Sequence, residues 1–429
     1  PGGYVAAIRA AQLGADVTLV ERQHLGGTCL NVGCIPTKCL LHSAELVEQI
    51  KTQGRDIGVE VDGVRVNFPQ VIAHKNAISK QLTSGVAGLL KLNKVKKIDG
   101  EAKFIGEKKL SVKKADGSVQ EMTADAIIVA TGSVNAQPPI PGLKENPNCI
   151  DSTGALSLEK LPRTMVVIGG GVIGMEFASF FNSLGVQVTV VEMLDEILGG
   201  GMDRELAGML RAEYAKRGIK FMLSAKVVSV MPDTAEASSL IQVNYETADG
   251  PGSVVAERLL MSVGRRPVMK GFGLENLGLE RTERGNVFVN GQMQTSVPGV
   301  YACGDLTGYS LLAHTAVREA EVAIHSIIGR KDTMSYRAIP GVVYTNPEIA
   351  GVGETEESLQ KRGIAYRAVK LPMAYSGRFV AENEGVNGVC KLLLGSDDTV
   401  LGAHVLGNPA SEIITLAGMA IELKLTADE

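Results

Sequence analysis

Val166-Val167-Ile168-Gly169-Gly170-Gly171-Val172-Ile173-Gly174 begins with an apolar run and ends with the glycine spacing Gly-x-Gly-x-x-Gly. The apolar run predicts a buried strand, and the residues after the glycines predict a helix that reaches Leu184. A second apolar strand, Val186 to Val191, then ends at the acidic residue Glu192. This order of strand, glycine turn, helix, strand and acid is typical of a dinucleotide-binding unit.

The same pattern opens the chain at Pro1-Gly2-Gly3-Tyr4. A helical run follows, and the strand Val17 to Val20 leads to Glu21. In both copies the acid lies 18 residues after the last glycine, close to the spacing of roughly 20 that such a unit requires. Glycines let a pyrophosphate approach the helix N-terminus, and the acid binds ribose hydroxyls. The alternative, a purely structural turn, is disfavoured because the pattern occurs twice.

The composition excludes several classes of protein. A length of 429 residues predicts two to four domains, and the 50 glycines show no collagen-like period. A net charge of −4 with 21% charged residues provides no basic surface, so we expect neither nucleic acid nor membrane as a partner. The longest apolar stretch, Met165 to Met193, is interrupted by glycines and by Glu176, and it fails as a membrane span.

Two further strand-to-glycine segments, residues 126–133 and 299–305, flank the central unit. They predict an α/β protein with two Rossmann-like dinucleotide-binding domains, one inserted in the other. From Ile339 the pattern changes to strands such as Val389 to Leu394 and to a helix from Ser411 to about Leu425, which predicts a C-terminal α+β domain. We expect the boundaries 1–153 and 265–335 for the first domain, 154–264 for the inserted one, and 336–429 for the last.

Three of the six cysteines lie within eleven residues. Five residues of regular helix rise about 7.5 Å, which exceeds the roughly 4.4 to 6.8 Å between the Cα atoms of a disulfide. A bridge between Cys29 and Cys34 therefore needs an irregular turn, and Gly33 makes one possible. A thiol at the start of the helix that Pro36 predicts would have a lowered pKa, and Lys38 would share the helical face of Cys34.

Two alternatives for this cysteine pair stay open. Both thiols could be inert core residues, although the flanking glycines do not resemble a core stripe. His24 and His42 could join them as metal ligands, but their spacing matches no common zinc pattern. We expect no metal site.

The segment Gly26 to Lys38, the two fingerprints, Ala130-Thr131-Gly132 and Cys303-Gly304-Asp305 resemble the FAD-dependent pyridine nucleotide-disulfide oxidoreductases. The resemblance covers essentially the whole chain, and its Cys-x4-Cys motif is highly specific. Ile35-Pro36-Thr37-Lys38 favours the lipoamide-oxidising members over the NADPH-using glutathione and mercuric reductases. Glu192 supports NAD in the same way, since no Arg or Lys in Met193 to Glu196 could meet a 2′-phosphate.

The resemblance implies a redox relay with FAD and NAD as cofactors. The dihydrolipoyl group would arrive on the lipoyl domain of an acyltransferase in a 2-oxoacid dehydrogenase complex, or on the carrier protein of glycine cleavage. It would reduce a Cys29–Cys34 disulfide, with Cys29 exchanging with substrate and Cys34 facing the flavin. A homodimer formed through the C-terminal domain is implied, in the bacterial cytoplasm or in the mitochondrial matrix of a eukaryote. The alternatives are a related disulfide or mercuric reductase, or a flavin and NAD redox sensor without turnover.

The same resemblance assigns individual residues. The catalytic residues that it implies are Cys29, Cys34, Lys38 and Glu176, the last two as a pair at the isoalloxazine. The residues expected to bind the flavin cofactor are Gly2, Gly3, Glu21, Gly27, Thr28, Lys38, Ala102, Thr131, Gly132, Ser133, Gly304, Asp305, Leu311, Leu312, Ala313 and His314. The residues expected at the NAD site are Gly169, Gly171, Val172, Ile173, Gly174, Glu176, Glu192, Val227 and Gly264.

The family also uses a C-terminal histidine, paired with a glutamate, as the base, supplied by the other subunit. None of the six histidines lies in a His-Pro-Thr segment. His314 and Glu319 share the family's five-residue spacing, but His314 lies in the flavin-facing segment, so we interpret the pair as coincidental. We expect a chain truncated at both ends, without the first strand and this histidine. The full-length protein would reduce NAD with dihydrolipoamide, and this chain would turn lipoamide over weakly.

Overall fold

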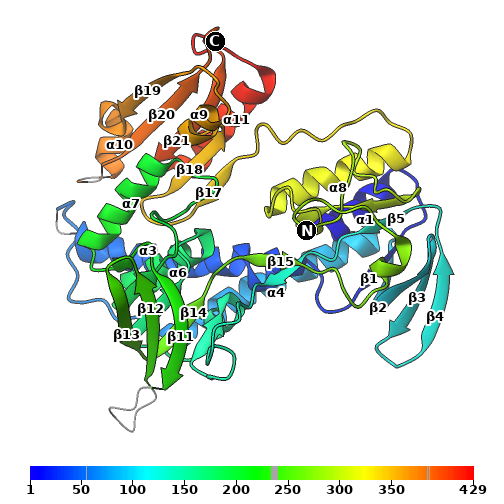
Figure 1. The fold of residues 1–429 in the computed structure, drawn as a ribbon, viewed down its shortest axis with the longest axis horizontal. Coiled ribbons are helices and arrows are strands. Elements are labelled where there is room, and N and C mark those ends of the chain that lie inside the picture. The colour runs from blue at the N-terminus through cyan, green and yellow to red at the C-terminus, as the bar shows by residue number, and fades with distance from the viewer. Residues whose placement is uncertain (55, 233–239, 384, 386) are drawn as a thin grey trace. The chain divides into compact units, whose positions relative to one another are not determined.

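The computed structural model describes residues 1–54, 56–232, 240–383, 385 and 387–429 (Figure 1). It divides into two compact units. The first comprises Pro1–Pro36, Asn76–Val134 and Arg265–Tyr336, and the second comprises Thr37–Lys75, Asn135–Gly264 and Arg337–Glu429. The nucleotide unit centred on Gly169 to Gly174 therefore interrupts the first unit, as the flanking strands predicted.

The first unit is built around the N-terminal fingerprint. Helix α1 (Gly2–Gln12) leads to β1 (Thr18–Glu21), which pairs in parallel with β2 (Lys96–Gly106). The sheet continues in antiparallel fashion through β3 (Lys109–Lys114) and β4 (Val119–Thr123). Strands β5 (Ile127–Val129) and β16 (Val300–Ala302) pair in parallel. This pairing confirms that the two segments flanking the central unit meet.

Alanines allow α1 to pack closely on two sides. Ala6 and Ala10 lie in one buried cluster with Ala320 of α8 (Ala313–Ile327). Ala7 lies in another with Val86 of α4 (Phe68–Leu92). Figure 1 shows α1 beside α8. Because alanine adds little bulk, both neighbours can approach the helix, which holds its N-terminus in place.

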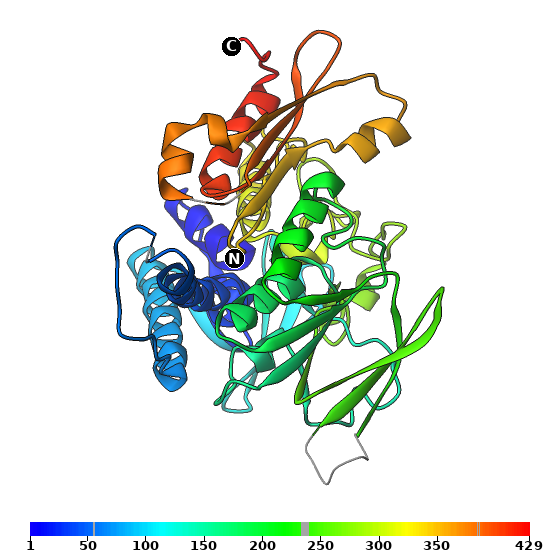
Figure 2. The ribbon, with the colours of Figure 1, turned by 90° about the vertical axis from the view of Figure 1, so that its left-hand side faces the viewer.

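The nucleotide part of the second unit has a parallel sheet in the order β10-β9-β8-β14-β7. Its strands are β7 (Cys149–Asp151), β8 (Thr164–Ile168), β9 (Gln187–Val191), β10 (Lys220–Met222) and β14 (Arg258–Met261). Helix α6 (Val172–Ser183) follows β8, and α7 (Arg204–Lys216) precedes β10. β11 (Lys226–Pro232), β12 (Ile241–Thr247) and β13 (Gly250–Ala256) form an antiparallel sheet, green in Figure 2.

The C-terminal part has an antiparallel sheet in the order β17-β18-β21-β20-β19. Its strands are β17 (Gly341–Val343), β18 (Ile349–Gly353), β19 (Arg367–Pro372), β20 (Val389–Leu394) and β21 (Val400–Leu406). Helix α11 (Ala410–Leu423) packs against β18 and β21 (Figure 1). It ends two residues before the expected Leu425, because Lys424 adopts a left-handed conformation with φ of 56°.

The remaining elements complete the chain. They are α2 (Gly27–Val32), α3 (Cys34–Thr52), α5 (Ser152–Ala155), α9 (Glu356–Lys361), α10 (Gly377–Glu382), β6 (Ser133–Asn135), β15 (Arg265–Pro267), and the 3-10 turns Leu274–Leu277, Gly304–Leu306 and Met373–Tyr375. Within the ranges described above, no helix has the length and apolarity needed to cross a membrane.

Candidate active site

The three glycines of the central fingerprint have different steric surroundings. Gly169 has φ of 96°, and a Cβ atom there would lie 2.6 Å from the carbonyl oxygen of Ser262. A Cβ atom on Gly174 would lie 2.0 Å from the carbonyl oxygen of Gly169. A Cβ atom on Gly171 would meet open space. Two glycines therefore serve the close packing of turn, strand and helix, while the third leaves the helix N-terminus accessible.

The fingerprint helices also lack side-chain caps. Neither α6, with Gly171 at its N-cap, nor α1, with Pro1, has a side-chain cap or an acidic residue in its first turn. By contrast, Asp203 and Thr355 cap α7 and α9. The first N–H groups of α1 and α6, together with the helix dipoles, are therefore placed to bind an anion. This arrangement fits the pyrophosphate of a dinucleotide in each unit.

The two acidic residues are held by backbone amides in the same way. Glu192 accepts hydrogen bonds from the amides of Gly170 at 2.6 Å and Leu194 at 2.8 Å. Glu21 accepts one from Gln23 at 2.8 Å. Such a fixed carboxylate suits ribose hydroxyls and disfavours a 2′-phosphate.

In the first unit, three residues form a polar cluster. Ser133 Oγ donates a hydrogen bond to Asp305 Oδ2. Arg265 Nε donates to Ser133 Oγ at 2.7 Å and lies 3.7 Å from Asp305 Oδ2. The sequence predicted Ser133 and Asp305, and the structure brings them together. It missed Arg265, for which the only signal was its position directly after Gly264.

Glu319 holds the neighbouring turn at Gly304 by hydrogen bonds. It is fully buried, and its carboxylate accepts hydrogen bonds from the Gly304 amide at 2.6 Å and from Tyr336 Oη at 2.7 Å. Burial raises the pKa of Glu319 to about 7. Gly304, with φ of 76°, directly precedes Asp305. The sequence offered Glu319 only as a coincidental partner of His314, and the structure gives it a role in holding this turn.

The cysteine pair spans a break between two helices. α2 ends at Val32, and α3 begins at Cys34. Gly33 between them has φ of −144° and ψ of −120°, and a Cβ atom there would lie 2.9 Å from the carbonyl oxygen of Thr28. The predicted irregular turn at Gly33 is confirmed. Both thiols are half-buried, and Cys34 occupies the first position of α3.

Lys38 and Glu176 both contact Tyr344 in the second unit. Only 7% of Glu176 is exposed, and its Oε1 accepts a hydrogen bond from the Tyr344 amide at 3.1 Å. Lys38 Nζ lies 3.8 Å from the centre of the Tyr344 ring. Burial raises the pKa of Glu176, while the charge of Lys38 and the amide of Tyr344 oppose the rise. Sequence reasoning predicted the lysine and the glutamate and missed Tyr344.

The remaining predicted residues occupy varied positions. Gly27 and Thr28 lie in α2, Ala102 in β2, and Val172 and Ile173 at the start of α6. Thr131 Oγ1 donates to the carbonyl of Val268, and the carbonyl of Gly264 accepts from Ala136. Leu311 and Leu312 directly precede α8, which begins with Ala313 and His314. The side chain of Val227 packs in the hydrophobic core of the second unit.

Comparison with known proteins identifies the family. Residues 1–320 match the model of the pyridine nucleotide-disulphide oxidoreductases, and residues 339–429 match the dimerisation domain of the same family. The mitochondrial dihydrolipoyl dehydrogenases of Canis lupus familiaris and Homo sapiens are each 40% identical over 437 aligned residues. The alignment covers all of this chain and 84% of each relative.

Two solved structures extend the comparison. LpdA from Mycobacterium tuberculosis superposes with a TM-score of 0.90 at 28% identity, covering 100% of this chain and 93% of LpdA. The HOCl-induced flavoprotein disulfide reductase RclA from Escherichia coli superposes with a TM-score of 0.85 at 28% identity, covering 99% and 92%.

The uncapped N-termini of α1 and α6 and the cysteine pair are features expected of such a family. Enzymes of the dihydrolipoyl dehydrogenase type use FAD and NAD. The matched dimerisation domain supports a homodimer. The chain belongs to the pyridine nucleotide-disulphide oxidoreductase family and is an FAD-dependent disulfide oxidoreductase.

Proposed function

We propose that this enzyme oxidises the dihydrolipoyl group carried by a lipoyl domain and passes the electrons to NAD. The partner would be an acyltransferase of a 2-oxoacid dehydrogenase complex or the carrier protein of glycine cleavage. The observation that carries the proposal is the pair Cys29 and Cys34 at the break between α2 and α3. The 40% identity to the mammalian dihydrolipoyl dehydrogenases supports this substrate.

The proposed reaction conserves atoms and electrons. A thiolate of the dihydrolipoyl group attacks Cys29 of the Cys29–Cys34 disulfide, and Cys34 leaves as a thiolate. The second lipoyl thiol then displaces Cys29, so that the lipoyl group leaves as a cyclic disulfide and the protein holds both thiols. Two electrons and two protons have moved to the protein at this point. Their onward transfer to NAD⁺ yields NADH and one H⁺ and restores the protein disulfide.

The residues around the pair suit these steps. Cys34 stands at the first position of a 19-residue helix, where the free N–H groups and the dipole favour a thiolate. Lys38 follows one turn later on the same face of α3. FAD, when bound, supplies the two-electron exchange between thiol and nicotinamide chemistry. The uncapped N-termini of α1 and α6 would hold the pyrophosphates of FAD and NAD respectively.

An apolar face on α11 supports the homodimer. Leu416, Met419 and Leu423 lie three and four residues apart, and 71%, 56% and 64% of their respective surfaces are exposed in the single chain. An exposed apolar helical face of this kind is usually covered by a protein partner. A cytoplasmic location is part of the proposal for a bacterial source. For a eukaryotic source we propose the mitochondrial matrix, because the mammalian relatives are mitochondrial.

A spectroscopic and kinetic experiment tests the proposal. The purified protein should be yellow, and anaerobic dihydrolipoamide should reduce it and produce long-wavelength absorbance from a thiolate beside the flavin. Cys29→Ser and Cys34→Ser should each lower the rate of lipoamide-linked NADH formation by at least about a hundredfold. Cys149→Ser is the matched control, because Cys149 lies in β7 and burial raises its pKa to about 11.

Full lipoamide activity in Cys29→Ser would refute the proposed role of the pair. A wild-type protein that binds flavin and NADH but turns over neither lipoamide nor any other disulfide would instead identify a redox sensor. A strong preference for NADPH would identify a reductase of the glutathione or mercuric type.

A further inference from the structure

Tyr344 contacts both members of the charge pair at Glu176. Its ring centre lies 3.8 Å from Lys38 Nζ, and its backbone amide donates a 3.1 Å hydrogen bond to Glu176 Oε1. The lysine comes from α3 and the glutamate from α6, whereas Tyr344 directly follows β17. One residue therefore connects two charged groups that lie on different helices.

The contact has an electrostatic consequence. A lysine ammonium over a tyrosine ring is attracted by the ring quadrupole, and the attraction grows as water is excluded. Lysine also has many rotamers, and the ring limits those open to Lys38. Burial raises the pKa of Glu176 and the Lys38 charge opposes the rise, so an ammonium held in place favours the ionised carboxylate. Loss of the ring would free the ammonium and weaken this opposing effect.

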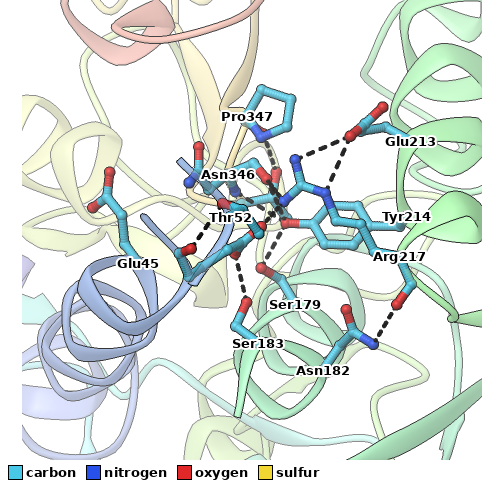
Figure 3. A network of polar contacts seen from close by, with 12 residues as sticks. Glu45, Thr52, Ser179, Asn182, Ser183, Glu213, Tyr214, Arg217, Asn346 and Pro347 are labelled. Carbon is cyan, nitrogen blue, oxygen red and sulfur yellow. Dashed lines mark hydrogen bonds and ion pairs between the residues drawn. The ribbon is translucent and has the colours of Figure 1, made fainter. Parts of the chain in front are cut away.

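The segment that carries Tyr344 is itself firmly held. Two residues further on, the amide of Asn346 donates to Tyr214 Oη at 3.0 Å. The carbonyl of Asn346 accepts from Tyr214 Oη at 3.1 Å and from Arg217 Nη1 at 2.6 Å. Tyr214 is fully buried and also bonds Ser179 Oγ at 2.7 Å, as Figure 3 shows. The backbone at Asn346 is therefore fixed by two side chains of the segment that includes α7.

The same hydrogen-bond network includes residues of α3 and α6, the helices that carry Lys38 and Glu176. Arg217 forms an ion pair with Glu48, which lies in α3 ten residues after Lys38. Ser183 of α6 donates to Glu48 at 2.7 Å. Helices α3 and α6 are thus tied at Glu48, and the Tyr344 segment joins the same two helices at Lys38 and Glu176. This double attachment holds the backbone of the Tyr344 segment relative to both helices.

We propose that Tyr344 is a positioning residue that holds the Lys38 ammonium near the Glu176 carboxyl group during turnover. The inference rests on the proposed function and on the expectation, implied by the family resemblance, that this pair lies at the flavin. Through the pair, Tyr344 sets the reduction potential of the flavin, because a positive charge beside it favours the reduced state.

The test uses the FAD-bound dimer and three tyrosine variants. Tyr344→Leu removes the ring, and Tyr344→Phe retains it together with the backbone amide. Tyr366→Leu is the matched control, because the Tyr366 hydroxyl bonds Gln360 and Glu356. The potential is measured by equilibration with a reference dye, and kcat and KM are measured with lipoamide and NADH.

Tyr344→Leu should favour the oxidised flavin about tenfold, a shift of about 30 mV to lower potential for a two-electron couple. Its kcat should fall by a similar factor while the KM for NADH stays within about twofold, because the NAD fingerprint is untouched. Tyr344→Phe should restore the potential. Equal losses in the leucine and phenylalanine variants would assign the effect to the hydroxyl group and overturn the inference.

A double-mutant cycle separates positioning from general packing. If Tyr344 acts through Lys38, then Tyr344→Leu should leave the potential unchanged in a Lys38→Met background. An additional shift of the same size in that background would overturn the inference, and so would a wild-type potential in the single Tyr344→Leu variant. Absence of lipoamide turnover in the wild type would refute the proposed function, while the dye equilibration would still decide the role of Tyr344.

Discussion

Replacing Glu319 with glutamine should change how the stability of the protein depends on pH. Glu319 is fully buried, and burial raises its pKa to about 7, whereas a glutamate ordinarily titrates near 4.5. Between these two values the unfolded chain has released the proton and the folded chain still holds it. Stability from this group is therefore complete below about pH 4.5, falls as the pH rises towards 7, and is constant above.

The magnitude follows from the size of the shift. Each pKa unit corresponds to about 1.36 kcal/mol, so the free energy of unfolding should fall by about 3 kcal/mol across this range on account of Glu319 alone. Glu319→Gln removes the titration. The amide offers only one acceptor oxygen to donors that include Gly304 N–H and Tyr336 O–H, and this should cost about 1 to 3 kcal/mol relative to the protonated wild type at low pH.

The assay is urea unfolding of wild type and variant between pH 5 and 8, followed by circular dichroism. The variant should be clearly less stable at pH 5 and should approach or exceed the wild type at pH 8. Glu321→Gln, a half-exposed position on the same helix, is the control and should show no such crossing. A stability difference between Glu319→Gln and wild type that stays constant with pH would refute the reasoning.

Three further changes give separate tests. Gly174→Ala places a Cβ atom 2.0 Å from the carbonyl oxygen of Gly169, so it should raise the KM for NADH roughly tenfold or more; a KM equal to that of wild type would contradict the steric argument. Glu192→Ala removes the carboxylate expected to bind the ribose, so the ratio of kcat/KM for NADH over NADPH should fall about tenfold, which steady-state kinetics can measure. Lys391→Met leaves the buried carboxylate of Asp203 without the ammonium 2.7 Å away; the free energy of unfolding should drop by about 3 to 5 kcal/mol, and an unchanged urea midpoint would contradict this.

Much of the fold was predictable because its signals are local. The glycine spacing and the apolar runs predicted β8, α6 and β9 with small errors at their ends. The strand-to-glycine pattern assigned β5 and β16 to the first nucleotide unit, and the fold pairs them in parallel. The end of α11 was placed too late, since nothing in the sequence marks the left-handed conformation of Lys424.

The candidate site was predictable only where chemistry is concentrated in a motif. Cys29, Cys34 and Lys38 stand close together in sequence, and Glu192 follows its fingerprint at a set distance. Arg265 belongs to no motif, because it meets Ser133 only through the fold.

The sequence by itself determined the two dinucleotide cradles and the break between the cysteines, because glycine and helix geometry act over a few residues. Tertiary structure alone decided what supports them. Glu319 reaches the Gly304 amide from 15 residues away, and Tyr344 reaches Glu176 from 168 residues away. Such contacts depend on how distant helices and strands pack, and a buried carboxylate acquires its raised pKa only when that packing excludes water.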